Sequence, residues 1–149
     1  MSTTPGAGPV AYWRRMENRR SFVAIVDDEE SVRRALLRLL RAANMDAEAF
    51  ASGEAFLSSL DKIRPDCVVL DLQMPGLTGR DVQKRLISMH INLPVILITA
   101  HDDMVTQQQS LSDGAASYLR KPLRGDLLVR SINESIARAG GTSGNRTES

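Results

Sequence analysis

The 149-residue chain contains a single cysteine, has no long apolar run and carries a net charge of only +1. Cys67 cannot form an internal disulfide, and its place inside an apolar run predicts a buried, inert thiol. No apolar run approaches the roughly 20 residues that cross a bilayer, and the N-terminus lacks the order of a secretory signal, so we expect a cytoplasmic protein. The near-neutral charge argues against a surface that generally binds nucleic acid or adsorbs to membranes.

What the chain does contain is enough apolar material for one folded domain. With 42% hydrophobic residues, a chain of this length can bury a core without metals or disulfides. Residues 1–20 are small or arginine-rich and predict a flexible basic leader, and residues 140–149 are rich in Gly, Ser and Thr and predict a flexible tail. The folded domain is therefore expected over residues 21–139.

Strand-like and helix-like segments alternate along this domain. Short apolar runs predict strands at residues 22–26, 47–50, 67–71, 95–99 and 117–119. Helical spacing of apolar residues and capping signals predict helices after Asp28, from Ser52 to Leu60, and at residues 78–89, 104–112 and 124–139. Because each crossover places a helix over the sheet, this alternation predicts an α/β fold whose parallel sheet is covered on both faces.

Polar residues stand where the predicted strands end. Asp27 and Asp28 follow the first strand, Asp71 ends the third, and Thr99 ends the fourth. Lys121 follows the fifth strand directly. Ligands of open parallel sheets bind beyond the carboxyl ends of the strands, so these groups are expected around one crevice.

The acids have two interpretations. Clustered carboxylates repel one another and either hold protons or share a cation, and oxygen ligands without a nearby His or Cys favour Mg²⁺. Alternatively, the run Asp27-Asp28-Glu29-Glu30 places negative charge at the start of the first helix, where it stabilises the helix.

The third strand end also has two interpretations. A carboxylate such as Asp71 can accept a phosphoryl group as a mixed anhydride when a metal and an amine offset the charge on the transferred oxygens. Thr99 and Lys121 are residue types that bind such oxygens. Taken singly, each residue also has a structural explanation: Asp71 as a loop capper, Thr99 as a strand-end residue and Lys121 as a surface amine.

Four short segments carry these residues: Val26-Asp27-Asp28-Glu29, Leu70-Asp71-Leu72-Gln73-Met74-Pro75-Gly76, Ile98-Thr99-Ala100 and Tyr118-Leu119-Arg120-Lys121-Pro122. In this order and approximate spacing, the chain resembles the receiver domains of bacterial two-component response regulators from about Phe22 to Arg138. Within these segments, the sequence is most similar to receivers of the FixJ-like group. The resemblance implies a doubly wound (βα)5 flavodoxin-like fold, as in CheY, with a five-stranded parallel sheet in the order 2-1-3-4-5.

The resemblance also implies roles for the acids. Asp71 would be the phosphoacceptor. Asp27, Asp28 and Asp71 would bind Mg²⁺ together with the backbone carbonyl of Gln73. Gln73 itself stands at a variable place where the family tunes how fast the phosphate is lost, and His101 stands at another.

The remaining implied roles concern the phosphoryl group and the switch. Lys121 would pair with the acyl phosphate, Thr99 would hydrogen-bond a phosphoryl oxygen, and the small Ala100 would leave room for the group. Thr99 and Tyr118 would change conformation on phosphorylation, although Tyr118 is also explained as a half-buried strand aromatic. The bond between Lys121 and Pro122 matches one that the family often holds in cis.

The function implied is a Mg²⁺-dependent switch rather than an enzyme. Asp71 would take its phosphate from a sensor histidine kinase or a histidine phosphotransfer protein, and the change would be passed to a downstream protein partner. The first helix has an arginine-rich outer side, which is either a docking surface for the kinase or simply a solvated face. The short segment after the last helix leaves no room for a helix-turn-helix, so we expect a single-domain regulator without direct DNA binding.

Three alternatives stay open. The chain could be the receiver fragment of a DNA-binding regulator, or a binding module that keeps only the fold and works without phosphorylation. A haloacid-dehalogenase-like phosphatase also uses an aspartate nucleophile with Mg²⁺, but it needs a second Asp two residues later. Gln73 occupies that place, which argues against turnover of external substrates.

Overall fold

The structure is a computed structural model that describes residues 20–101 and 103–148. Its centre is a five-stranded sheet with the strand order β2-β1-β3-β4-β5. The strands are β1 (Phe22–Val26), β2 (Asp46–Phe50), β3 (Cys67–Asp71), β4 (Val95–Thr99) and β5 (Ser117–Arg120). All neighbouring strands pair in parallel, which confirms the expected order and direction.

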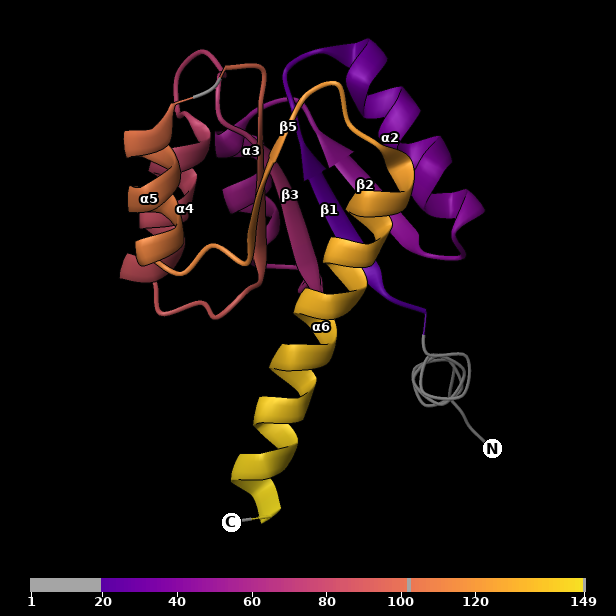
Figure 1. The fold of residues 1–149 in the computed structure, drawn as a ribbon, viewed down its shortest axis with the longest axis vertical. Helices are drawn as coiled ribbons and strands as arrows, with labels where there is room; N and C mark the ends of the chain where they lie inside the picture. The colour runs from indigo at the N-terminus through magenta and orange to yellow at the C-terminus, as the bar shows by residue number, and fades with distance from the viewer. Residues whose placement is uncertain (1–19, 102, 149) are drawn as a thin grey trace.

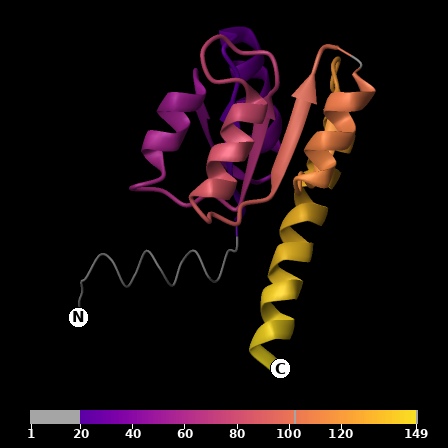
Figure 2. The same cartoon turned by 90° about the vertical axis from the view of Figure 1, so that its left-hand side faces the viewer.

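Helices cover both faces of this sheet. On one face lie α2 (Glu30–Ala42) and α6 (Gly125–Glu148), as Figure 1 shows. On the other lie α3 (Gly53–Ser59), α4 (Gly79–Ser88) and α5 (Met104–Ser112), and Figure 2 shows α3 beside α4. The doubly wound (βα)5 fold is thus confirmed.

The strands explain why two helical layers are needed. Val23 and Ile25 of β1 belong to the core cluster that α2 and α6 cover, whereas Ala24 and Val26 belong to the cluster under α3 and α4. All four side chains have no exposed surface. Successive residues of a strand face opposite sides of the sheet, so a strand that is apolar throughout is stable only when both faces are covered.

Cys67 begins β3 and is completely buried, as predicted. Burial raises the pKa of its thiol to about 12, and its Sγ lies 3.7 Å from Oγ of Ser135 in α6. Because the thiolate is the reactive form, the thiol is poorly suited to redox or nucleophilic chemistry at neutral pH.

Side chains that accept backbone hydrogen bonds fix the starts of three helices. Ser52 Oγ accepts the N–H of Ala55 at 3.1 Å, which confirms the predicted cap of α3. Thr78 and Asp81 form a reciprocal capping box at α4, and Asp103 caps α5. These caps set the directions in which α4 and α5 leave the edge of the sheet where β3 and β4 end.

The last helix is longer than predicted. The expected end at Ala139 rested on Gly140 and Gly141, since glycine is a poor helix former. The structure instead continues α6 to Glu148, where the backbone runs clear of the sheet (Figure 1). Once a helix has formed, each further residue adds a backbone hydrogen bond, and this offsets the low propensity. Whether residues 140–149 are flexible stays a prediction, and residues 1–19 of the predicted leader lie outside the described residues. No described helix combines the length and apolar character needed to cross a lipid bilayer.

Candidate functional site

One edge of the sheet brings together the polar residues that the sequence placed at strand ends. Asp27 follows β1, Asp71 is the last residue of β3, Thr99 is the last of β4, and Lys121 follows β5. The parallel register places Asp71 opposite Ile98, beside Thr99, so neighbouring strands end at the same level. The structure thus gathers these residues at the edge of the sheet where the carboxyl ends of the parallel strands lie.

Three carboxylates meet at this edge of the sheet. One oxygen each from Asp27, Asp28 and Asp71 lies within 4.8 Å of the others. Asp27 has no exposed surface and Asp71 is only 3% exposed, whereas Asp28 is exposed. Burial, and next the charge of Asp27, raise the pKa of Asp71 to about 6. The cluster thus contains more negative charge than its surroundings readily accommodate.

This donor set fits a hard divalent cation. It consists of carboxylate oxygens, without a histidine or cysteine among them, and one of the three acids faces solvent. Mg²⁺ is bound in this way, through a few carboxylates with positions left for water or phosphate oxygens. The assignment of Mg²⁺ and of the Gln73 carbonyl as a further ligand stays a prediction.

Lys121 is the cation that the structure places among the acids. Its Nζ lies 3.2 Å from Oδ2 of Asp27, 3.7 Å from Oδ1 of Asp71 and 3.9 Å from Oε1 of Glu29. Its side chain is 20% exposed, so the amine is partly accessible to solvent while it contacts the acids. An amine there can stabilise negative charge that develops on oxygens next to Asp71.

The alternative interpretation of the acids as helix caps is also partly right. Asp27 Oδ1 accepts the N–H of Glu29 at 2.9 Å, so this carboxylate orders the entry to α2 as well as facing Lys121. Glu29, the N-cap residue, makes no side-chain capping bond. Glu30 pairs with Arg34 on the surface of α2.

Arg33 is a contributor to the site that sequence reasoning missed. Arg33 is one of the arginines of the first helix, whose arginine-rich side was expected to face outward, but it is half-buried and donates from NH1 to the carbonyl of Asp27 at 2.8 Å. This bond holds the end of β1 in place. The signal was its position one turn after the acid run, where a basic side chain can reach back.

Thr99 is 1% exposed and lies in a small network with Gln73 and His101. Its hydroxyl donates to Oε1 of Gln73 at 3.0 Å and lies 3.1 Å from the carbonyl of His101, while it accepts the N–H of His101 at 3.0 Å. The N–H of Ala100 also points to Oε1 of Gln73, at 3.4 Å. The side chain of Gln73 therefore has a structural role that the sequence did not reveal.

The loop after Asp71 requires a glycine at position 79. A Cβ on Gly79 would lie 2.6 Å from the carbonyl oxygen of Asp71 and 3.0 Å from Cα of Leu72. The first turn of α4 thus packs directly on the backbone that carries the carboxylate. Sequence reasoning did not single out Gly79, although a glycine inside a helix start is a signal of close backbone approach.

The comparisons with known proteins agree with this geometry. The family model described as response regulator receiver domain matches residues 23–133. The chain belongs to this family. Its receiver domain is 32% identical over 123 residues to the response regulator protein TodT of Pseudomonas putida, covering 83% of the chain and 54% of TodT.

Solved receiver structures are similar over most of the chain. A response regulator receiver protein from Burkholderia phymatum is 45% identical with a TM-score of 0.71, covering 79% of this chain and 96% of that one. The crystal structure of FixJ-N is 32% identical with a TM-score of 0.73, covering 78% and 94%. The chain spans about half the length of TodT.

Two further expectations concern β5. The peptide bond between Lys121 and Pro122 is cis, as the resemblance implied. Tyr118 is half-buried and packs against the core cluster under α3 and α4. Its role as a switch residue stays a prediction.

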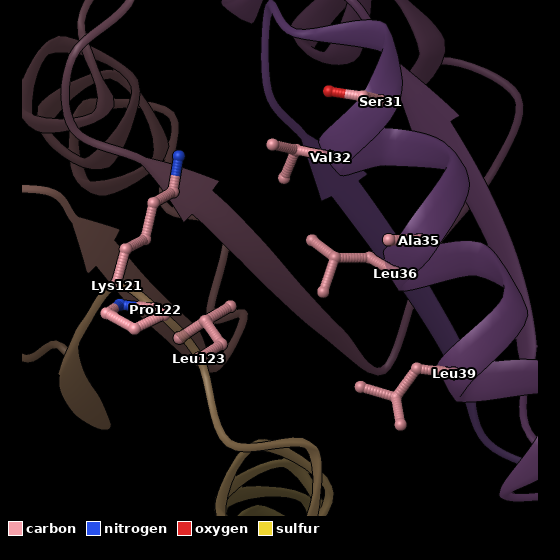
Figure 3. Close-up of a pocket in the computed structure, with 8 residues that line it drawn as sticks. All are labelled: Ser31, Val32, Ala35, Leu36, Leu39, Lys121, Pro122 and Leu123. Atoms are coloured by element: carbon pink, nitrogen blue, oxygen red, sulfur yellow. The ribbon is translucent and has the colours of Figure 1, made fainter.

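An apolar groove adjoins the acid cluster of the receiver domain. It has a volume of about 340 Å³, and we call it the α2 groove; its lining is Ser31, Val32, Ala35, Leu36, Leu39, Lys121, Pro122 and Leu123. Figure 3 shows Val32, Leu36 and Leu39 pointing from α2 toward the segment after β5. Lys121 belongs both to this groove and to the acid cluster.

Proposed function

We propose that Asp71 accepts a phosphoryl group from a phosphohistidine on a sensor histidine kinase or a histidine phosphotransfer protein. The observation that carries the proposal is the contact of 3.7 Å between Asp71 Oδ1 and Lys121 Nζ, inside a cluster of three acids. A buried carboxylate beside an amine and a cation site is arranged for transfer of an anionic group. The proposed reaction belongs to the cytoplasm, where kinases draw on ATP.

The transfer is a displacement at phosphorus. A carboxylate oxygen of Asp71 forms the new P–O bond, the P–N bond of phosphohistidine breaks, and its electron pair leaves on the imidazole, which takes up a proton. With a pKa of about 6, Asp71 is ionised at neutral pH and can act as the nucleophile. Lys121 offsets the charge on the transferred oxygens.

Asp27, Asp28, Asp71 and the backbone carbonyl of Gln73 would hold Mg²⁺. When bound, the cation would neutralise charge on the carboxylates and on the phosphoryl oxygens. The raised pKa of Asp71, caused in part by the charge of Asp27, supports this need for a cation.

The consequence of phosphorylation is a switch in protein contacts. The phosphoryl group adds acceptors and nearly two negative charges next to Thr99. We propose that Thr99 turns toward the phosphoryl oxygen while Ala100 leaves space for it, and that Tyr118 follows. The surface formed by α5, β5 and α6 then binds a downstream protein partner with changed affinity.

We assign the α2 groove to the helix that carries the phosphohistidine. The groove is continuous with the acid cluster through Lys121, so a helix lying in it would bring its histidine close to Asp71. On α2 itself, the exposed Arg34, Arg38 and Arg41 favour a partner with an acidic surface. Ala35→Trp, at an exposed position of the groove, should slow transfer from a protein donor but leave labelling by acetyl phosphate unchanged. Equal slowing with both donors would count against this docking site.

The proposed role is that of a phosphoacceptor, not of an enzyme with external substrates. Gln73 stands where an aspartyl-phosphate phosphatase would need its second acid. In the proposed function the receiver domain does not bind DNA directly. In a longer protein, DNA binding would reside in another domain. A module that binds without phosphorylation is the competing hypothesis.

Intact-protein mass separates these hypotheses. The chain is incubated with acetyl phosphate, with Mg²⁺ or with EDTA. We expect a single phosphoryl addition that requires Mg²⁺, is lost in Asp71→Asn, and is retained in the control Asp61→Asn, which changes an exposed aspartate. No addition to a wild-type chain that binds Mg²⁺ would reject phosphorylation by a small donor and favour the binding module.

A further inference from the structure

The side-chain carbonyl of Gln73 accepts from two donors at the end of β4, the strand that neighbours the one ending in Asp71. Thr99 Oγ1 donates to Gln73 Oε1 at 3.0 Å, and the N–H of Ala100 points to the same oxygen at 3.4 Å. Gln73 lies two residues after Asp71, and its backbone N–H in turn donates to Asp71 Oδ1 at 3.3 Å. One residue thus connects the phosphoacceptor strand with the end of β4.

The hydroxyl of Thr99 cannot serve two acceptors fully at once. It carries one proton, and both Gln73 Oε1 and the His101 carbonyl lie within hydrogen-bond distance of its oxygen. The hydroxyl also accepts the N–H of His101, which fixes its orientation further. A phosphoryl oxygen on Asp71 would have to take this proton away from these acceptors.

We infer that Gln73 is a positioning residue that holds Thr99 in the unphosphorylated arrangement by mimicking a phosphoryl oxygen. This inference rests on the proposed phosphorylation of Asp71. The Gln73 amide and the phosphoryl group compete for the Thr99 hydroxyl and the Ala100 N–H, and only one of them is satisfied at a time. Gln73 therefore opposes activation and must release both donors when the phosphoryl group arrives.

The exposure of Gln73 makes this competition possible without disturbing the core. Its side chain is exposed, whereas Thr99 is almost completely buried. The glutamine can leave its partners and become hydrated, but the Thr99 hydroxyl needs a protein or phosphoryl acceptor. Substitutions at Gln73 should therefore change the switch and leave folding intact.

Beryllium trifluoride, which binds carboxylates as a phosphoryl analogue, measures the competition at equilibrium and without hydrolysis. Gln73→Met fills similar space without the carbonyl acceptor. Its affinity for beryllium trifluoride in the presence of Mg²⁺ should be about threefold to tenfold higher than that of wild type, the range expected for removing one competing hydrogen bond. Gln108→Met, which changes an exposed glutamine of α5, is the matched control and should bind as wild type does.

A second measurement reads Thr99 directly in the unphosphorylated chain. Three-bond couplings to the Thr99 methyl should report one side-chain rotamer in wild type and a larger share of other rotamers in Gln73→Met, where only His101 still holds the hydroxyl. Gln73→Glu restores an acceptor oxygen and should restore the single rotamer. A purely structural effect of the substitution would not be rescued in this way.

The outcomes distinguish this inference from the proposed function. Equal affinity of wild type and Gln73→Met for beryllium trifluoride, or an unchanged Thr99 rotamer, would overturn the role of Gln73 alone. Failure of wild type to bind beryllium trifluoride, together with no mass addition from acetyl phosphate, would overturn the proposed function and this inference with it.

Discussion

Nζ of Lys121 lies 3.2 Å from Oδ2 of Asp27, a carboxylate with no exposed surface. Removing one member of such a pair leaves a buried charge without compensation. In EDTA, Lys121→Met should therefore lower the free energy of unfolding by about 1–3 kcal/mol, less than for a fully buried pair because the lysine is partly exposed. Urea denaturation followed by circular dichroism measures this change.

Mg²⁺ provides the control within the same experiment. A bound cation replaces part of the charge that Lys121 supplied, so adding Mg²⁺ should stabilise Lys121→Met more than wild type. Lys62→Met, at an exposed lysine, should match wild type under both conditions. A stability loss that Mg²⁺ leaves unchanged would show that Lys121 acts through packing and not through the acid cluster.

The ionisation of Asp71 makes stability depend on pH. Its pKa is raised from 3.8 to about 6, first by burial and next by the charge of Asp27. The folded chain thus binds the proton of the Asp71 carboxyl more tightly than the unfolded chain does. The stability that this proton contributes is complete below pH 3.8 and is lost as the pH rises through about 6. In EDTA and above about pH 6, the free energy of unfolding of Asp71→Asn should be about 1–3 kcal/mol larger than that of wild type. This difference should shrink as the pH is lowered.

Unfolding by urea at a series of pH values tests this sign. Asp61→Asn, at an exposed aspartate, should follow wild type throughout. Mg²⁺ should narrow the gap near neutral pH, because the cation stabilises the ionised carboxylate only in wild type. An advantage of Asp71→Asn that grows toward acid pH would contradict the raised pKa.

Much of the site could be predicted because each of its residues is marked by the short stretch of sequence around it. Asp27, Asp71 and Thr99 each stand directly after an apolar run that can only be a buried strand, and parallel strands end at a common edge. The residues that end the strands or follow them directly therefore place the acids, the hydroxyl and the amine together.

What could not be predicted depends on tertiary packing. The amide of Gln73 meets Thr99 only because β3 and β4 are neighbours and two loops approach each other above them. Arg33 turns back to the carbonyl of Asp27, although the arginine-rich side of its helix was expected to face outward. The extension of α6 past Gly140 is likewise a backbone effect that residue propensities argue against.

Gly79 gives a prediction that no side-chain contact would suggest. Alanine there would place a Cβ 2.6 Å from the carbonyl oxygen of Asp71, so either α4 or the end of β3 must shift. Gly79→Ala should cost about 1–3 kcal/mol in the free energy of unfolding and should lower phosphoryl incorporation from acetyl phosphate. Gly140→Ala adds the same methyl group inside α6 where nothing lies within 4 Å, so it should leave labelling unchanged and should not lower the free energy of unfolding, because alanine is the better helix former. Normal stability and labelling in Gly79→Ala would mean that the backbone around Asp71 is more pliable than its packing indicates.

Gln83 joins α4 to α5, the two helices that follow the ends of β3 and β4, where Asp71 and Thr99 lie. Its Nε2 donates to the carbonyl of Ser110 at 2.9 Å, its Oε1 accepts from Arg80 at 2.6 Å, and Arg80 also pairs with Asp113 at 2.9 Å. Gln83 is only 2% exposed, so Gln83→Met leaves the Ser110 carbonyl without its donor in a buried place. The cost should be about 1–3 kcal/mol, and backbone amides of α5 should exchange with deuterium faster than in wild type, whereas Gln108→Met should change neither. Mass spectrometry of deuterium uptake resolves the helices, and faster exchange spread evenly over the sheet would assign Gln83 to global stability instead of to the coupling of α4 and α5.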